Sequence, residues 1–205
     1  MNHDTELPQI LCSQPPPDAQ HLDIDHDGVL LSEESAQAIF DELQSNDEFF
    51  WEYADDGCLA RAHKMCAILH EKGVFCEKIR ADNARGTWLC PFGISILKED
   101  DKWLHMNFHM AVLVRVAVST WIEDRVIDPA LFSGPVSVKA WLEKLINRDS
   151  IQRDGTIGIS EQQKDVTRLP FDVFERRLFW ANKDRDLKIT NRLLQLHREN
   201  FEKGR

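Results

Sequence analysis

Cys58 lies at the start of a pattern that is typical of an amphipathic helix. The acidic turn Asp55-Asp56-Gly57 precedes it, and apolar residues then recur at helical spacing until Gly73, which predicts a helix from Cys58 to about Lys72. A cysteine on the first turn of a helix faces unpaired N–H groups and the positive end of the helix dipole, which favour the thiolate. Those N–H groups could also stabilise an oxyanion. The alternative is a small, buried, apolar cysteine with no chemical role.

A histidine and an aspartate follow in two predicted strands. Polar His105, Asn107 and His109 alternate with apolar residues in a run that continues to Val116, and this alternation predicts one strand. A second apolar run ends at Asp128, directly before a proline, where a strand is expected to stop. A cysteine at a helix start, a histidine on a strand and an aspartate at the end of the next strand can act as nucleophile, base and orienting group.

Several segments around these residues resemble one known family. The segments are DDGCLARAHKMCAIL, CEKI, FHMAVLV and VIDPALFSGPVSVKAWL, in this order, between about Phe49 and Leu145. Together they resemble the bacterial protein-glutaminase family, the protein-glutamine deamidases. The resemblance implies that Cys58 is the nucleophile, His109 the base and Asp128 its orienting group. It also implies a papain- or transglutaminase-like core, and hydrolysis of glutamine side chains in proteins or peptides without a cofactor for catalysis.

The histidine segment departs from the family pattern, in which a tryptophan closely precedes the histidine. Here Trp103 lies further upstream, His105 intervenes, and Phe108 takes the aromatic position. We favour His109 over His105 as the base because Met110-Ala111-Val112 follows it. His63 lies five residues after Cys58 in the predicted helix, which is more than one turn, so we expect it to point away and to serve packing or hydrogen bonding.

Two other functions fit the same residues. The first is transglutaminase- or protease-type acyl transfer, because a triad does not determine the acyl acceptor or the bond attacked. The second is a calcium-responsive, non-enzymatic binding or effector module that keeps the scaffold. Amine incorporation or backbone fragments would reveal the first, and a calcium-dependent melting temperature without ammonia release would reveal the second.

An acidic segment, 23–34, fits the pattern of a calcium-binding loop. Alternating oxygen ligands, a glycine at the sixth place and a glutamate at the twelfth can surround a hard cation. The alternative is an acidic turn that precedes a helix over about 32–43, with Ser32 as its N-cap. The ligands that the pattern predicts are Asp23, Asp25, Asp27, Val29 and Glu34.

The order of predicted elements favours an α+β fold with an antiparallel sheet packed against helices. After the Cys58 helix, strands are predicted at Val74–Ile79 and Trp88–Leu97, before the histidine and aspartate strands, and a helix at Val138–Ile146. We divide the chain into a flexible leader (1–20), a catalytic domain (21–148) and a helical C-terminal extension (149–205). The extension includes an apolar helix-like stretch at 171–180 and a basic amphipathic helix at 187–201, expected to pack on the domain.

Composition limits the partners. The 205 residues carry a net charge of −10, which argues against nucleic acid and anionic membranes, and no membrane span or secretion signal is visible. We therefore expect synthesis in the cytoplasm. Export by a route that needs no signal peptide is the alternative, since family relatives include secreted proteins and delivered effectors or toxins. If Cys58 is catalytic, four of the five cysteines remain, and these can form two disulfides. The partner is expected to be a protein or peptide that bears glutamine, and no dedicated partner is identified.

Overall fold

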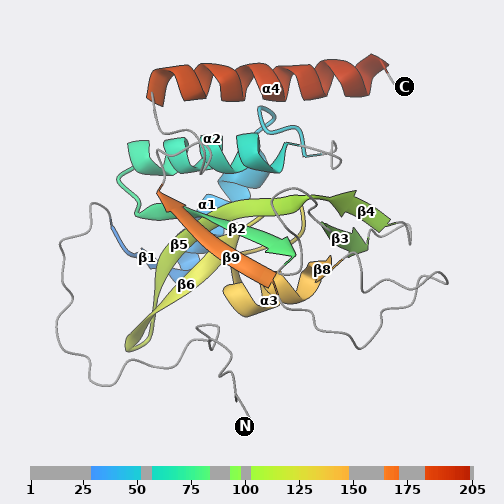
Figure 1. The fold of residues 1–205 in the computed structure, drawn as a ribbon. Helices are drawn as coiled ribbons and strands as arrows, with labels where there is room; N and C mark the ends of the chain where they lie inside the picture. Colours follow the sequence, from blue (N-terminus) through green and yellow to red (C-terminus); the bar gives the residue numbers. More distant parts are fainter. Residues whose placement is uncertain are drawn as a thin grey trace, which may run out of the picture.

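The computed structural model describes residues 29–51, 57–83, 93–97, 103–147, 164–170 and 183–203. Within these residues helices cover a central antiparallel sheet (Figure 1), so the predicted α+β class is confirmed. The elements are β1 (Leu31–Ser32), α1 (Glu33–Gln44), α2 (Cys58–Glu71), β2 (Cys76–Asn83), β3 (Ile94–Leu97), β4 (Trp103–Met106), β5 (Phe108–Val118), β6 (Trp121–Ile127), β7 (Val136–Ser137), α3 (Val138–Lys144), β8 (Ile146–Asn147), β9 (Lys164–Pro170) and α4 (Lys183–Lys203).

The larger sheet has β5 near its centre. Its strand order is β7-β6-β5-β2-β9, with all these neighbours antiparallel, and β1 pairs with β5 in parallel. Strand β5 joins β2 through the pair Ala81↔His109 and joins β6 through the pair Val112↔Ile127. A separate antiparallel sheet has the order β4-β3-β8. Because β9 belongs to the larger sheet, residues 149–205 supply a strand of the sheet as well as a helix.

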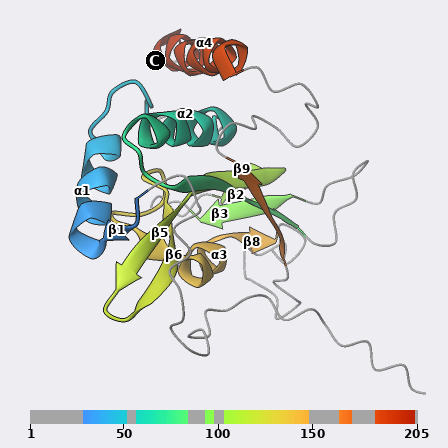
Figure 2. The same ribbon diagram turned by 90° about the vertical axis from the view of Figure 1, so that its left-hand side faces the viewer.

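Both faces of β5 are buried, since its side chains alternate between two hydrophobic clusters. Met110, Val112 and Val114 pack against α1 and α2, whereas Ala111 and Leu113 pack in the cluster that contains Trp141 of α3. Figure 2 shows α2 between the sheet and α4, with α3 beyond the opposite face of the sheet. The start of α2 and the first residues of β5 are thereby fixed from several sides.

The Cys58 helix begins and ends as its sequence predicts. Gly57 is the N-cap, with a φ of 95° and no side-chain capping hydrogen bond, and Lys72 is the C-cap. Gly73 follows with a φ of 72°, a left-handed conformation in which glycine carries no steric penalty. The predicted N-cap of α1 is also confirmed, because the Ser32 hydroxyl accepts a hydrogen bond from the Ser35 N–H at 3.1 Å.

The prediction of one continuous strand from His105 to Val116 is wrong. The strand breaks at Asn107, so that β4 belongs to the small sheet and β5 to the large one. His105 pairs with Ser95 in β3, whereas His109 pairs with Ala81 in β2. The two histidines therefore do not share one face of a single strand.

Other predicted bounds shift by a few residues. The strand expected at Val74–Ile79 is β2, which begins two residues later, at Cys76, and ends four residues later, at Asn83. The helix expected at Val138–Ile146 stops at Lys144 because Ile146 pairs in β8. The amphipathic helix predicted at 187–201 is confirmed within α4. The leader at 1–20, the loop residues before Val29, the strand residues 88–92 and the stretch at 171–180 lie outside the described residues.

Candidate active site

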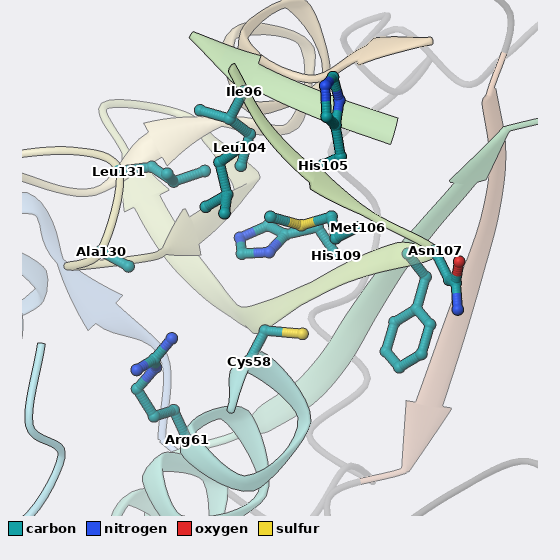
Figure 3. A pocket seen from close by; sticks show the side chains of 11 residues that line it. Cys58, Arg61, Ile96, Leu104, His105, Met106, Asn107, His109, Ala130 and Leu131 are labelled. Carbon is teal, nitrogen blue, oxygen red and sulfur yellow. The ribbon is translucent and has the colours of Figure 1, made fainter. Parts of the chain in front are cut away.

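Cys58 is the first residue of α2 and lines a cavity. The side chain is half-buried and the thiol is free. The cavity has a volume of about 340 Å³, and residues of α2, β3, β4, β5 and the turn after Asp128 line it. Figure 3 shows the Cys58 side chain rising from the start of α2 toward the ring of His109. Since the Gly57 N-cap supplies no side-chain acceptor, the N–H groups of the first turn can act on a bound group near the thiol.

His109 and Asp128 form a buried pair beside this cysteine. The side chains are 4% and 5% exposed, and His109 Nε2 lies 2.7 Å from Asp128 Oδ2. The same carboxylate oxygen accepts a hydrogen bond from the Trp141 indole N–H at 2.9 Å. Asp128 thus fixes the orientation of the imidazole ring, and Trp141 fixes the carboxylate.

The charge of Asp128 governs the protonation of His109. Burial is the largest single influence and disfavours the imidazolium, but the charge and hydrogen bond of Asp128, followed by the interaction with Cys58, outweigh it and raise the pKa of His109 to about 10. Because Asp128 occupies Nε2, the nitrogen left for the thiol is Nδ1. Among the described residues Nδ1 has no partner at normal hydrogen-bond distance, an arrangement common before a substrate closes the site.

His105 lines the cavity from β4, and its ring contacts Ser95. Its side chain is exposed, and Nδ1 lies 2.6 Å from the hydroxyl of the buried Ser95. His105 therefore has a position on the cavity wall, and the pairing with Asp128 belongs to His109. The backbone of β4 is held close to Gly93, where a Cβ atom would lie 2.5 Å from the Met106 carbonyl oxygen.

His63 lies apart from this cluster, as expected from its spacing. It is 2% exposed, and Nδ1 lies 3.1 Å from the Nζ of Lys78, which is fully buried on β2. The prediction that His63 serves packing and hydrogen bonding is confirmed. Nearby Cys66 and Cys76 are free thiols, and burial, followed by the hydrogen bond and charge of Cys76, raises the pKa of Cys66.

The predicted calcium ligands are only partly described. Val29 is exposed and bridges to Val74, and Glu34 lies in the first turn of α1. The backbone N–H of Glu34, followed by the Ser32 hydroxyl, lowers the pKa of the Glu34 carboxyl. Asp23, Asp25 and Asp27 lie outside the described residues. In the described part of the chain no three carboxylate, histidine or cysteine side chains form a group suited to a metal ion.

Sequence reasoning missed two residues of the site. Trp141 falls in the helix predicted at Val138–Ile146, but its contact with Asp128 depends on how α3 packs on the sheet. Arg61 is 4% exposed, lines the cavity and lies over the ring of Trp51 at 5.6 Å. Its position one turn after Cys58 was the available signal, since residues three apart share a helix face.

Comparisons with known proteins identify the family and the fold of the chain. A family model described as glutaminase matches residues 36–145. No curated protein sequence matches significantly. A crystal structure of protein-glutaminase is 25% identical, with a TM-score of 0.61, over 82% of this chain and 88% of that one. A solution structure of protein-glutaminase from Chryseobacterium proteolyticum is 25% identical, with a TM-score of 0.60, over 81% and 86%.

The pro-form of protein-glutaminase has the same fold as this chain. A crystal structure of pro-protein-glutaminase is 22% identical, with a TM-score of 0.61, over 89% of this chain and 64% of that one. The match of the family model covers more than half of the chain and includes Cys58, His109 and Asp128. The chain therefore belongs to the glutaminase family.

Proposed function

We propose that this protein hydrolyses the side-chain amide of glutamine in proteins or peptides, giving glutamate and ammonia. The observation that carries the proposal is that Cys58 of α2 and His109 of β5 line one cavity, while Asp128, directly after β6, pairs with His109. Membership of the glutaminase family and the likeness to protein-glutaminase structures support the reaction type.

The side chains suggest a two-step reaction. In the first step the Cys58 thiolate attacks the amide carbon, and imidazolium His109 gives its proton to the departing ammonia. In the second step His109 removes a proton from water, which hydrolyses the thioester to glutamate. Asp128 stabilises the imidazolium throughout, and the first-turn N–H groups of α2 stabilise the oxyanion.

A protonated His109 is the expected resting state of the site. A pKa of about 10 for His109 keeps the imidazole protonated near neutral pH, and this positive charge favours the thiolate of Cys58. A protonated histidine suits an amide substrate, because the poor leaving group needs a proton as the C–N bond breaks.

The test is ammonia release from an unfolded, glutamine-containing protein, with wild type compared to Cys58→Ala. Intact-mass analysis of the substrate should show an increase of about 1 Da for each converted amide, from replacement of NH₂ by OH, without fragments or added amine. Ammonia release by Cys58→Ala at the wild-type rate would overturn the assignment. Fragments or amine incorporation would instead indicate the protease- or transglutaminase-type alternative.

We propose separately that residues 23–34 bind a calcium ion in a structural role. The spacing of Asp23, Asp25, Asp27, Val29 and Glu34 supports this, and the last residues of the segment form β1 and the start of α1. Millimolar calcium should raise the melting temperature, and Asp25→Asn should abolish the rise while leaving deamidation of the same substrate unchanged. An equal rise in both proteins would contradict the site.

A further inference from the structure

The C-terminal helix α4 lies along α2, the helix that begins with Cys58 (Figures 1 and 2). Thr190 and Leu194 of α4 are buried, at 0% and 4% exposed. Asn191 accepts a hydrogen bond from the Lys64 ammonium group at 2.9 Å. The direct contact between the two helices therefore extends over more than one turn of α4.

The contact reaches the residue that precedes the cysteine. His197 of α4 is 8% exposed, and a Cβ atom built on Gly57 would lie 2.7 Å from its Nδ1 and 2.9 Å from its Cε1. These distances are shorter than real Cβ contacts, so the imidazole occupies the space beside Gly57 that any other residue would need for its side chain. One peptide bond separates this contact from Cys58.

The neighbouring residue of α4 contacts the segment before the Cys58 helix. Arg198 donates a hydrogen bond to the Asp47 carbonyl, and its guanidinium lies 5.5 Å from the ring centroid of Phe50. Phe50 has a positive φ of 50°, a conformation that surrounding contacts must hold in place. Two consecutive residues of α4 thus contact the chain on both sides of residues 52–56.

The start of α2 has no side-chain cap of its own. Its N-cap is a glycine with a φ of 95° and no side-chain capping hydrogen bond. A glycine loses more conformational entropy on folding than other residues, and it offers no side-chain oxygen to the first-turn N–H groups. Contacts from outside the helix can therefore add to the order of its first turn.

We propose that His197 is a positioning residue for Cys58. Its ring packs on Gly57 and holds the first turn of α2 so that the thiol stays beside the ring of His109 and the first-turn N–H groups stay at the cavity. This inference rests on the proposed function, since it names a further residue that the same site requires. It also gives the C-terminal segment a role in the active site that is distinct from filling the core.

The alternative is that α4 only stabilises the fold, and Leu194 provides the matched control. Leu194 is buried in the same helix, so Leu194→Ala should weaken the packing of α4 and lower the melting temperature without removing the ring beside Gly57. His197→Ala removes the ring, and His197→Gln keeps a polar side chain that can fill part of the space. All variants are made in the full chain.

The main readout is the rate at which iodoacetamide alkylates Cys58, followed by peptide mass spectrometry across a range of pH. It needs no turnover, so it tests His197 even if the proposed reaction proves wrong. We expect His197→Ala to move the midpoint of this profile upward by about one pH unit, because a frayed first turn stabilises the thiolate less. We expect Leu194→Ala to keep the wild-type midpoint and His197→Gln to restore it in part.

Turnover supplies the second readout. A small displacement of a reacting group can cost up to roughly a hundredfold in rate, so His197→Ala should lower kcat between about ten- and a hundredfold with KM within about twofold of wild type. The proposal is overturned if His197→Ala and Leu194→Ala both lower the melting temperature while the alkylation profile and kcat stay at wild-type values. Equal shifts of the profile in both variants would also overturn it.

A reciprocal test uses the close approach itself. Gly57→Ala places a Cβ against the imidazole, and His197→Ala in that background removes the clash while the strain of a positive φ remains. We expect the double variant to alkylate faster than Gly57→Ala alone. If the effects of the two substitutions on the alkylation rate simply multiply, the two residues are not coupled and the proposal is overturned.

Discussion

Replacing Asp128 with asparagine keeps the size of the side chain but removes the charge that faces His109. In the wild type this charge and its hydrogen bond are the main influences that favour the imidazolium, and the pKa of His109 rises from 6.5 to about 10. At 1.36 kcal/mol per pKa unit, this rise corresponds to roughly 5 kcal/mol of preference for the protonated ring. Without the charge, burial dominates, and the pKa of His109 should fall below 6.5.

The loss of the preference for a protonated His109 sets the expected size of the effect on kcat. Each 1.36 kcal/mol of lost transition-state stabilisation costs a factor of ten in rate, so 5 kcal/mol gives an upper limit of several thousandfold. We expect Asp128→Asn to lower kcat for ammonia release by roughly a thousandfold, with KM little changed. The pH profile of Cys58 alkylation should move upward as well, because a neutral imidazole no longer stabilises the thiolate.

A matched control is Glu123→Gln, which removes a carboxylate from β6 that pairs with Arg125 at 2.9 Å, away from the cavity. Ion pairs near the surface contribute about 0–1 kcal/mol, so this variant should keep wild-type kcat. The reasoning is refuted if Asp128→Asn retains kcat within tenfold of wild type. It is also refuted if the alkylation profile of Cys58 does not move.

Three further predictions follow from the contacts above. The folded-state pKa of His109 lies above the unfolded value of 6.5, so its contribution to stability is complete below pH 6.5 and is lost as pH rises to about 10. The expected loss is roughly 1.4 kcal/mol per pH unit. Urea unfolding between pH 6.5 and 10 should show this slope in wild type relative to Asp128→Asn, and the same pH dependence of the unfolding free energy in both proteins would contradict it. Trp141→Phe removes one hydrogen bond to the Asp128 carboxylate, so kcat should fall by about tenfold with the circular dichroism spectrum unchanged, and unaltered kcat would exclude this role. Ser32→Ala removes the N-cap of α1 and should lower the free energy of unfolding by about 1 kcal/mol without affecting kcat, which equilibrium denaturation can check.

The sequence was informative where a local pattern determines the structure. The spacing of apolar residues and two glycines predicted α2, and a serine before two glutamates predicted the start of α1. Asp128 was predicted at a strand end because an apolar run stops there before a proline, and β6 does end at Ile127. Helix spacing also predicted that His63 lies away from the cavity.

The sequence was less informative where the partner of a strand or helix determines the structure. The alternation of polar and apolar residues continues through Asn107, so periodicity does not reveal that the chain passes from one sheet to another there. Lys78 lies in an otherwise ordinary strand pattern, and its complete burial beside His63 depends on α2. The contacts of Trp141 with Asp128 and of His197 with Gly57 join residues that are 13 and 140 positions apart, respectively.

The close approach of Gly93 to the Met106 carbonyl has a consequence for engineering. A Cβ at position 93 would lie 2.5 Å from this backbone oxygen, and a positive φ of 74° adds strain for any side chain there. Variation at position 93 would therefore push β4 outward and disturb the whole wall of the cavity. A library intended to change which glutamines are accepted should keep Gly93 and vary the side chains of Ile96, Leu104 and Leu131, which line the cavity from a fixed backbone.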